Sequence, residues 1–167
     1  MRNVCLFILL VMLIGCIHET DADPEKNEFL NNILGSWKAE CERDLISDGY
    51  QQPFLKIDDS LFDIYLNYYS DNSCSVFKSE GGHTHASYII GSIYMTESGL
   101  SARKLDLSVV RTTPISNEST YIEEQKHIIY MNENKIFFGD LGGEPFSDTT
   151  KRPTSLNFDE FYEKVVE

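Results

Sequence analysis

The sequence predicts an all-β protein, a single antiparallel barrel or sandwich of about eight strands, and three observations lead to this prediction. From residue 32 onward, apolar and polar residues alternate in short segments, as they do in strands that bury one face. Turn-forming clusters separate these segments: DDS at 58–60, DNS at 71–73 and NEN at 132–134. The 10 Phe and 9 Tyr of the 167-residue chain are enough for one packed core. We therefore expect one domain over residues 32–167.

The expected strands follow one another along this domain. Residues 54–57 form a short alternating segment that runs into the DDS turn. In the next segment, alternate residues share a face, with Phe62, Ile64, Leu66 and Tyr68 on one side and Asp63, Tyr65, Asn67 and Tyr69 on the other. A short strand at 74–78, a doubly covered strand at 88–96 and a half-buried strand at 105–109 come next. Residues 121–131 and 135–140 flank NEN and predict a hairpin.

The end of the chain has a different pattern, with apolar residues spaced as on one face of a helix. Phe158, Phe161, Tyr162 and Val165 recur at i, i+3, i+4 and i+7, and Asn157 stands where an N-cap would. This spacing predicts a short C-terminal helix over about 158–166. An extended segment lying on the barrel is the alternative.

The start of the chain predicts export. Arg2 precedes an unbroken apolar run over residues 4–14, which is long enough for a signal-peptide core and too short to span about 30 Å of hydrocarbon. The run ends in LIGC (13–16), which resembles the lipobox of bacterial lipoproteins. This resemblance implies that residues 1–15 are removed and that Cys16 becomes the lipidated first residue. The alternative is an ordinary signal peptide in which Cys16 has no special role.

The lipoprotein resemblance also implies how the protein is held and where. Diacylglycerol and a further acyl chain such as palmitate hold a protein firmly, since each buried methylene contributes roughly 0.8 kcal/mol. Ile17 occupies the position where Asp would commonly signal retention in the inner membrane. For a host with two membranes, the resemblance therefore favours a cell-envelope location at the outer membrane.

Without residues 1–15 the chain carries 13 basic against 27 acidic side chains, a net charge of −14. Such a surface repels phosphate backbones and anionic lipid, which argues against nucleic acid as a partner and for a covalent membrane anchor. Acidic residues without clear periodicity are concentrated in residues 16–31. We expect this stretch to be an acidic linker between lipid and domain.

Two of the four cysteines are left for the folded domain. Cys5 leaves with the signal peptide and Cys16 takes lipid, so Cys41 and Cys74 form an even pair in an oxidising compartment. A disulfide between them would close a loop of about 34 residues, worth around 3–4 kcal/mol. A metal or redox site is the alternative, although the sequence contains no C-x-x-C.

The opening of the domain, ILGSWKAEC (33–41), contains Gly35-x-Trp37 and the single Trp of the chain. It resembles the G-x-W opening of lipocalin-like barrels, and residues 32–164 as a whole resemble bacterial lipocalin-like proteins and the extracellular domains of the adenomatosis-polyposis-coli-down-regulated family. The resemblance implies that Trp37 plugs one end of the barrel beneath a basic residue near the last strand, for which Arg152 is the candidate and Lys151 the alternative. The T-D-Y element that lipocalins carry in mid-chain is missing.

Two histidines give the sequence its one candidate metal site. His83 and His85 in GGHTHAS would point the same way on a strand, so both imidazoles could bind one ion. His127, Asp71 or Glu80 could supply a third ligand. The alternative is a pair of exposed polar residues on a loop or strand edge.

The sequence otherwise predicts binding without catalysis and without a cofactor. Neither G-x-S-x-G nor H-E-x-x-H occurs. Aromatic residues that could line a cavity for a small apolar ligand are Phe62, Tyr65, Tyr68, Tyr88 and Tyr94. The alternative functions are docking on an envelope complex or, as in bacterial lysozyme-inhibitor lipoproteins, inhibition of a basic enzyme.

Overall fold

The structure is a computed structural model that describes residues 23–46, 48–112, 120–141 and 151–166. Within these ranges the chain forms one helix and nine strands. In chain order they are α2 (Pro24–Ile33), β1 (Gly35–Lys38), β2 (Glu42–Asp44), β3 (Gly49–Ile57), β4 (Leu61–Tyr69), β5 (Phe77–Met95), β6 (Ser101–Thr112), β7 (Thr120–Asn132), β8 (Lys135–Gly139) and β9 (Leu156–Lys164). The predicted signal peptide (1–15) and Cys16 lie outside the described residues.

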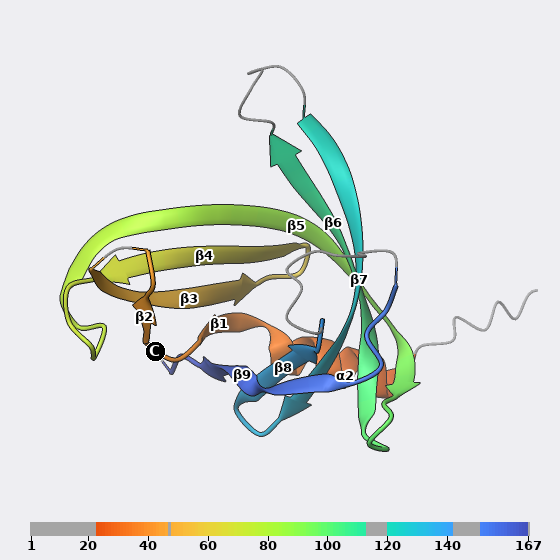
Figure 1. Cartoon of the computed structure of the whole chain (residues 1–167). Coiled ribbons are helices and arrows are strands. Elements are labelled where there is room, and N and C mark those ends of the chain that lie inside the picture. Colours follow the sequence, from red (N-terminus) through yellow and green to blue (C-terminus); the bar gives the residue numbers. More distant parts are fainter. Residues whose placement is uncertain (1–22, 47, 113–119, 142–150, 167) are drawn as a thin grey trace, which may run out of the picture.

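Eight of the strands close into a ring. Each strand from β3 to β9 pairs with the next along the chain, and β1 pairs with both β9 and β3, which joins the two ends of the series. β2 adds to the edge of β3. All pairings are antiparallel, which confirms the predicted all-β, antiparallel class. Figure 1 shows β3, β4 and β5 as one arched wall and the outer part of β6 and β7 as a projecting ribbon.

The first hairpin of the ring forms where local sequence favours it. Asp58 follows β3, and its carboxylate accepts hydrogen bonds from the backbone N–H of Ser60 at 2.9 Å and of Leu61 at 2.7 Å. These two bonds hold the pKa of Asp58 below its usual value. The turn fixes the register in which Ile57 faces Phe62, and both side chains are buried.

β5 is longer than the sequence predicts, because one strand of 19 residues replaces two separate strands and the GGHTHAS segment between them. Three register shifts let it bend with the wall: one opposite Tyr68 and Tyr69, one opposite Leu66, and one between Ile90 and Ile93. At the shift opposite Leu66, a Cβ on Gly81 would lie 2.7 Å from the ring of Tyr68. Glycine is therefore required there, in a strand rather than in a loop.

The predicted C-terminal helix is wrong, and residues 156–164 form strand β9 instead. Its backbone pairs with β8 at Phe161↔Phe137 and with β1 at Lys164↔Trp37, so it supplies the strand that closes the ring. The aromatic side chains that suggested a helix pack on β8 instead, with ring centroids 5.1 Å apart for Phe158 and Phe137. Unpaired edges on both neighbours favour a strand over a short isolated helix.

Helix α2 occupies the second half of the stretch that was expected to be a linker. Asp23 caps the helix by accepting a hydrogen bond from the N–H of Lys26 at 3.0 Å, and Pro24 is its first residue. Phe29 and Ile33 pack on the core, so α2 belongs to the folded domain. No helix among the described residues is long and apolar enough to cross a membrane.

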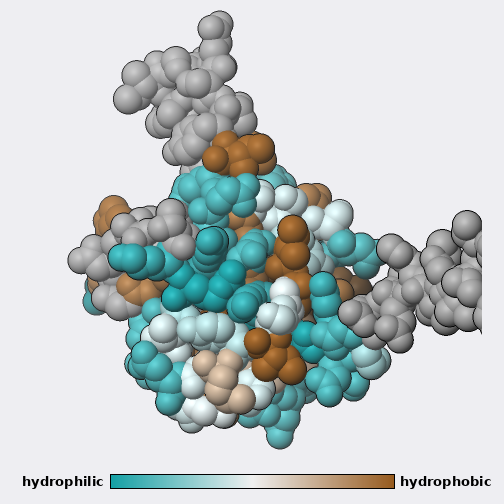
Figure 2. All heavy atoms as spheres, turned by 90° about the vertical axis from the view of Figure 1, so that its right-hand side faces the viewer, coloured by the Kyte–Doolittle hydropathy of each residue, from teal (hydrophilic) through white to brown (hydrophobic). Residues whose placement is uncertain are grey.

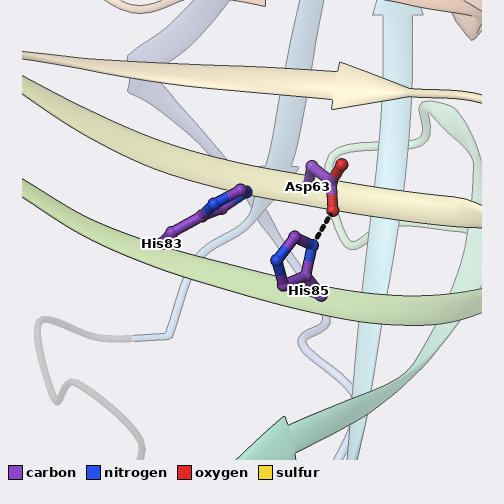
Figure 3. Close-up of side chains that lie close together, drawn as sticks. All are labelled: Asp63, His83 and His85. Carbon is purple, nitrogen blue, oxygen red and sulfur yellow. Dashed lines mark hydrogen bonds and ion pairs between the residues drawn. The ribbon is translucent and has the colours of Figure 1, made fainter. Parts of the chain in front are cut away.

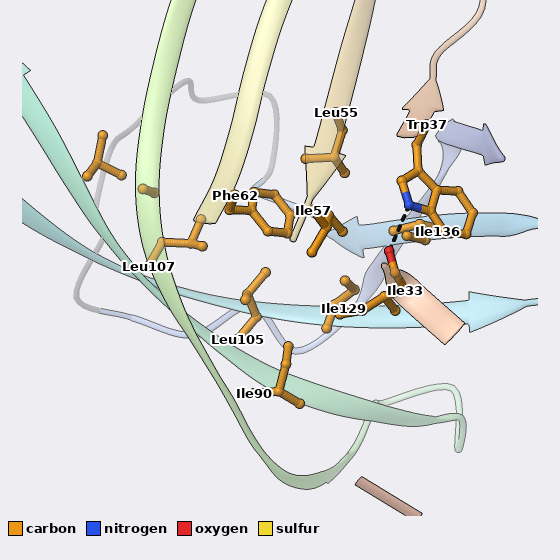
Figure 4. Close-up of a cluster of buried hydrophobic side chains, with 12 residues drawn as sticks. Ile33, Trp37, Leu55, Ile57, Phe62, Ile90, Leu105, Leu107, Ile129 and Ile136 are labelled. Carbon is orange, nitrogen blue, oxygen red and sulfur yellow. Dashed lines mark hydrogen bonds between the residues drawn. The ribbon is translucent and has the colours of Figure 1, made fainter. Parts of the chain in front are cut away.

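The core lies inside the ring and includes Trp37, at one side of the cluster (Figure 4). The indole is fully buried, and its N–H donates a hydrogen bond of 2.8 Å to the carbonyl of Ile33 at the end of α2. Gly35 joins helix to strand with φ +120°, a conformation that L residues with side chains rarely adopt. The side chains drawn in Figure 4 come from α2 and from strands around the ring, and they converge on one cluster.

The basic residue over Trp37 is Lys164 and not Arg152, which corrects the prediction. The Lys164 ammonium lies 5.1 Å from the centre of the indole and donates to the carbonyl of Asn32 at 2.9 Å. Arg152 instead pairs with Asp106 and donates to the carbonyl of His127, which ties the segment before β9 to β6 and β7. Closure of the ring by β9 brings Lys164 beside Trp37.

Cys41 and Cys74 form the predicted disulfide, with their Cα atoms 5.8 Å apart. Cys41 precedes β2, and Cys74 lies in the turn between β4 and β5. Asp71 organises that turn, because its carboxylate accepts hydrogen bonds from Ser73, Ser75 and the N–H of Val76. Together these hydrogen bonds hold the pKa of Asp71 far below its usual range, with the Ser73 hydroxyl as the largest cause.

Candidate functional site

The two predicted histidines meet a carboxylate across the sheet. His83 and His85 lie on β5, and the register places His85 opposite Asp63 and His83 opposite Tyr65 on β4. Residues two apart on a strand share a face, so all four side chains lie on one face of the wall. Figure 3 shows Asp63 and both imidazoles turned toward one another. The opposite face carries the buried core residues Phe62 and Ala86.

Asp63, His83 and His85 form a compact three-donor cluster. One donor atom from each residue lies within 4.8 Å of the other two. Nδ1 of His85 is 2.5 Å from Oδ1 of Asp63, and the two imidazole rings are 4.0 Å apart, centre to centre. The Asp63 side chain is only 19% exposed, whereas that of His85 is 56% exposed. The Asp63 carboxylate is therefore mostly covered, whereas the imidazoles are open to solvent, so an ion from solvent can reach the cluster.

Aromatic rings form one side of this cluster. The ring of Tyr65 meets that of His83 edge-on at 5.8 Å, and Phe54 on β3 stacks on Tyr65 at 5.2 Å. Burial, with smaller contributions from Tyr69 and Asp63, raises the pKa of Tyr65. Packing against Tyr65 limits the positions open to the His83 ring. The register also places Lys56 of β3 opposite Asp63, so the cluster has a cation beside its carboxylate.

A shallow hollow of about 300 Å³ adjoins the cluster at the glycine bulge. Its lining includes Tyr65, His83, Gly82 and Glu80. Glu80 was one of the three residues expected to complete a metal site, and it borders the same hollow without belonging to the three-donor cluster. The hollow leaves room for solvent or a small ligand beside His83.

The other two expected third ligands lie elsewhere. His127 is part of β7, where burial and the nearby Arg152 guanidinium lower its pKa. The Asp71 carboxylate is occupied by hydrogen bonds within its turn. Asp63 takes the third place instead. The alternation of residues 61–69 put Asp63 on the same face as Tyr65, but only the register between β4 and β5 brings it to His85.

The five aromatic residues that were expected to line a cavity are not gathered around one. Phe62 is buried in the core, where Tyr88 packs on it edge-on at 5.9 Å. Tyr65 lies beside the histidines, Tyr68 packs against Gly81, and Tyr94 joins a second apolar cluster near Ala102. The structure thus distributes these residues over both faces of the wall and two clusters.

The donor set fits a divalent transition metal. Two imidazoles and one carboxylate are ligands that Zn²⁺ accepts at about 2.0–2.2 Å, and three protein ligands leave a fourth tetrahedral position for water or another ligand. Ca²⁺ prefers six to eight oxygen donors, which this cluster does not offer. Comparison with known protein families, with curated proteins and with solved structures finds no match for this chain. Functional proposals therefore rest on the residues of the chain itself.

Proposed function

We propose that this protein is an exported, lipid-anchored and non-catalytic binding protein of the bacterial cell envelope, and that it binds Zn²⁺ or a similar divalent metal through Asp63, His83 and His85. The observation that carries the metal proposal is the convergence of three donor atoms within 4.8 Å on one face of β4 and β5. Two cross-strand pairs, each set by backbone hydrogen bonding, hold the donors at that spacing.

The chemistry of the donors supports zinc over hard cations. Imidazole nitrogen is a preferred ligand of Zn²⁺, Cu²⁺ and Ni²⁺, whereas Mg²⁺ and Ca²⁺ prefer oxygen. Zinc needs only modest movement here, because donors bound at about 2.0–2.1 Å in a tetrahedron lie roughly 3.4 Å apart. Binding of zinc by both Asp63 and His85 would replace the hydrogen bond between Oδ1 of Asp63 and Nδ1 of His85, which are 2.5 Å apart.

Two separate observations support export and anchoring. The border at LIGC (13–16) resembles a lipobox, and the Cys41–Cys74 disulfide is the kind of bond that persists outside the cytosol. A lipocalin-like barrel is consistent with the ring of eight strands and with Gly35-x-Trp37 at its opening. A location at the outer membrane follows from the lipoprotein resemblance and from Ile17.

Zinc binding is tested by isothermal titration calorimetry on protein with Cys16→Ala, which keeps it in solution. We expect one site per chain, and at least about tenfold weaker binding for His83→Ala, His85→Ala and Asp63→Asn. Glu28→Gln, a change to an exposed carboxylate on α2, is the matched control and should bind as the parent does. Equal affinity of all five proteins would exclude this site.

Anchoring is tested by fractionation of bacteria that express the full chain. The parent should sediment with membranes and carry acyl mass, and Cys16→Ala should be released into the soluble fraction. Sedimentation of that variant with the membranes would refute the lipid anchor.

Binding of a small apolar ligand, or of a basic protein, stays a prediction. Native mass spectrometry of protein from its own host tests both.

A further inference from the structure

The start of helix α2 is fixed to one end of the ring. Asp23 is the first described residue, and its carboxylate accepts a hydrogen bond of 3.0 Å from the buried guanidinium of Arg103 on β6. The same guanidinium lies 5.7 Å from the centre of the Phe29 ring on α2. Arg103 pairs across the sheet with Ile93 near the end of β5. The start of α2 and the end of β5 are therefore held together.

The proposed anchor keeps this end of the ring close to the bilayer. Cys16 precedes Asp23 by seven residues, and seven residues reach at most about 25 Å when fully extended. Lipid on Cys16 therefore limits how far Asp23, and the end of β5 beside it, can move from the membrane surface.

Apolar side chains are exposed at this end. Ile93 is 48% exposed and Met95 is 59% exposed, although both belong to the strand whose middle lines the core. Ile93 also borders a shallow hollow of about 200 Å³ with Phe29 and Met131. In Figure 1, β5 ends on the right of the ring, and Figure 2 shows hydrophobic patches breaking up the hydrophilic surface seen from that side.

We infer that this end of the ring, with Ile93 and Met95 at its centre, rests on the bilayer to which Cys16 is attached. The inference depends on the lipid anchor proposed above. Exposed Glu25 and Glu97 lie on neighbouring segments, and anionic lipid would repel their charges. The contact is therefore apolar rather than electrostatic, and it suits zwitterionic lipid better than anionic lipid. Ile and Met side chains would enter the headgroup boundary, as apolar residues of peripheral proteins do.

This orientation separates the metal cluster from the membrane. His83 lies ten residues before Ile93 on the same strand, and ten residues of strand extend roughly 33 Å. β5 arches over that length, so its two ends point to different sides of the ring (Figure 1). The imidazoles of His83 and His85 would then lie on a part of β5 remote from the end that contacts the bilayer.

Tryptophan quenching by brominated lipid tests the orientation. Lipidated protein carrying Met95→Trp is reconstituted into phosphatidylcholine vesicles whose acyl chains are brominated near the headgroup. Ile122→Trp is the matched control, since Ile122 is 65% exposed on the projecting ribbon of β6 and β7. Trp37 is fully buried and adds the same background to both proteins. We expect at least about twofold greater quenching for Met95→Trp, because bromine quenches only indoles at membrane depth.

Two results would overturn the inference, and they differ in what they say of the anchor. If the protein floats with the vesicles and both variants are quenched equally, the orientation is wrong and the anchor stands. If purified protein from the membrane fraction carries no lipid and does not float, the anchor is wrong and the orientation falls with it. Anionic vesicles of phosphatidylglycerol serve as a second arm, in which quenching of Met95→Trp should be weaker.

Discussion

Removal of the Cys41–Cys74 disulfide should destabilise the fold without changing it. The bond closes a loop of about 34 residues that contains β2, β3 and β4, and loop-closure entropy for that length corresponds to about 3–4 kcal/mol. With a urea dependence of about 2 kcal/mol/M, the unfolding midpoint of Cys41→Ser/Cys74→Ser should fall by roughly 2 M. The three-donor cluster lies on the wall formed by β3, β4 and β5, so loss of the disulfide should also make this wall unfold locally more often.

Urea unfolding followed by circular dichroism measures this loss. The oxidised parent, the reduced parent and the double variant are compared, and all should have the same native spectrum. We expect the reduced parent to match the double variant. Coincident midpoints for the oxidised parent and the double variant would refute the reasoning, as would two titratable thiols in the oxidised protein with Cys16→Ala.

Three further predictions follow from individual contacts. Trp37→Phe removes the hydrogen bond to the buried carbonyl of Ile33 and leaves a cavity, so the free energy of unfolding should fall by about 2–4 kcal/mol; an unchanged urea midpoint would contradict this. Asp71→Asn should lower stability at neutral pH. Because folding lowers the pKa of Asp71, its contribution is complete above the ordinary value of 3.8 and is lost as the pH falls below it, so the two proteins should converge in acid; a constant difference down to the lowest pH measured would contradict the assignment. Lys56→Gln removes a cation beside Asp63 and should tighten zinc binding about tenfold, since the repulsion between a unit charge and the double charge of Zn²⁺ at roughly 6 Å in water is about 1.4 kcal/mol; weaker binding measured by calorimetry would count against the site.

Local signals in the sequence predicted those parts of the fold that depend on local interactions. Alternation over residues 61–69 and the turn at Asp58 place β4, because the turn is closed by hydrogen bonds within four residues. Pairing of Cys41 with Cys74 could be predicted because the lipoprotein resemblance accounts for the other two cysteines. The N-cap Asp23 followed by Pro24 was a readable helix signal, but the acidic composition favoured a linker.

Features that depend on long-range pairing could not be predicted in the same way. Phe158 and Phe161 fit a helical period, and only the open edges of β1 and β8 make that segment a strand. The same closure places Lys164 over Trp37. Asp63 precedes His85 by 22 residues, and no spacing rule identifies a cross-strand ligand before the register is known. Two of the three donors, the histidines, were therefore visible in the sequence, and the carboxylate was not.

X-ray absorption at the zinc edge of the zinc-loaded protein tests the central claim most directly. If Zn²⁺ binds at Asp63, His83 and His85, the spectrum should contain the scattering of two imidazoles, with nitrogen and oxygen donors at about 2.0–2.2 Å. His83→Ala should lose the signal of one imidazole, and Glu28→Gln should retain both. A shell of oxygen donors alone, with no imidazole scattering in the parent, would contradict the account.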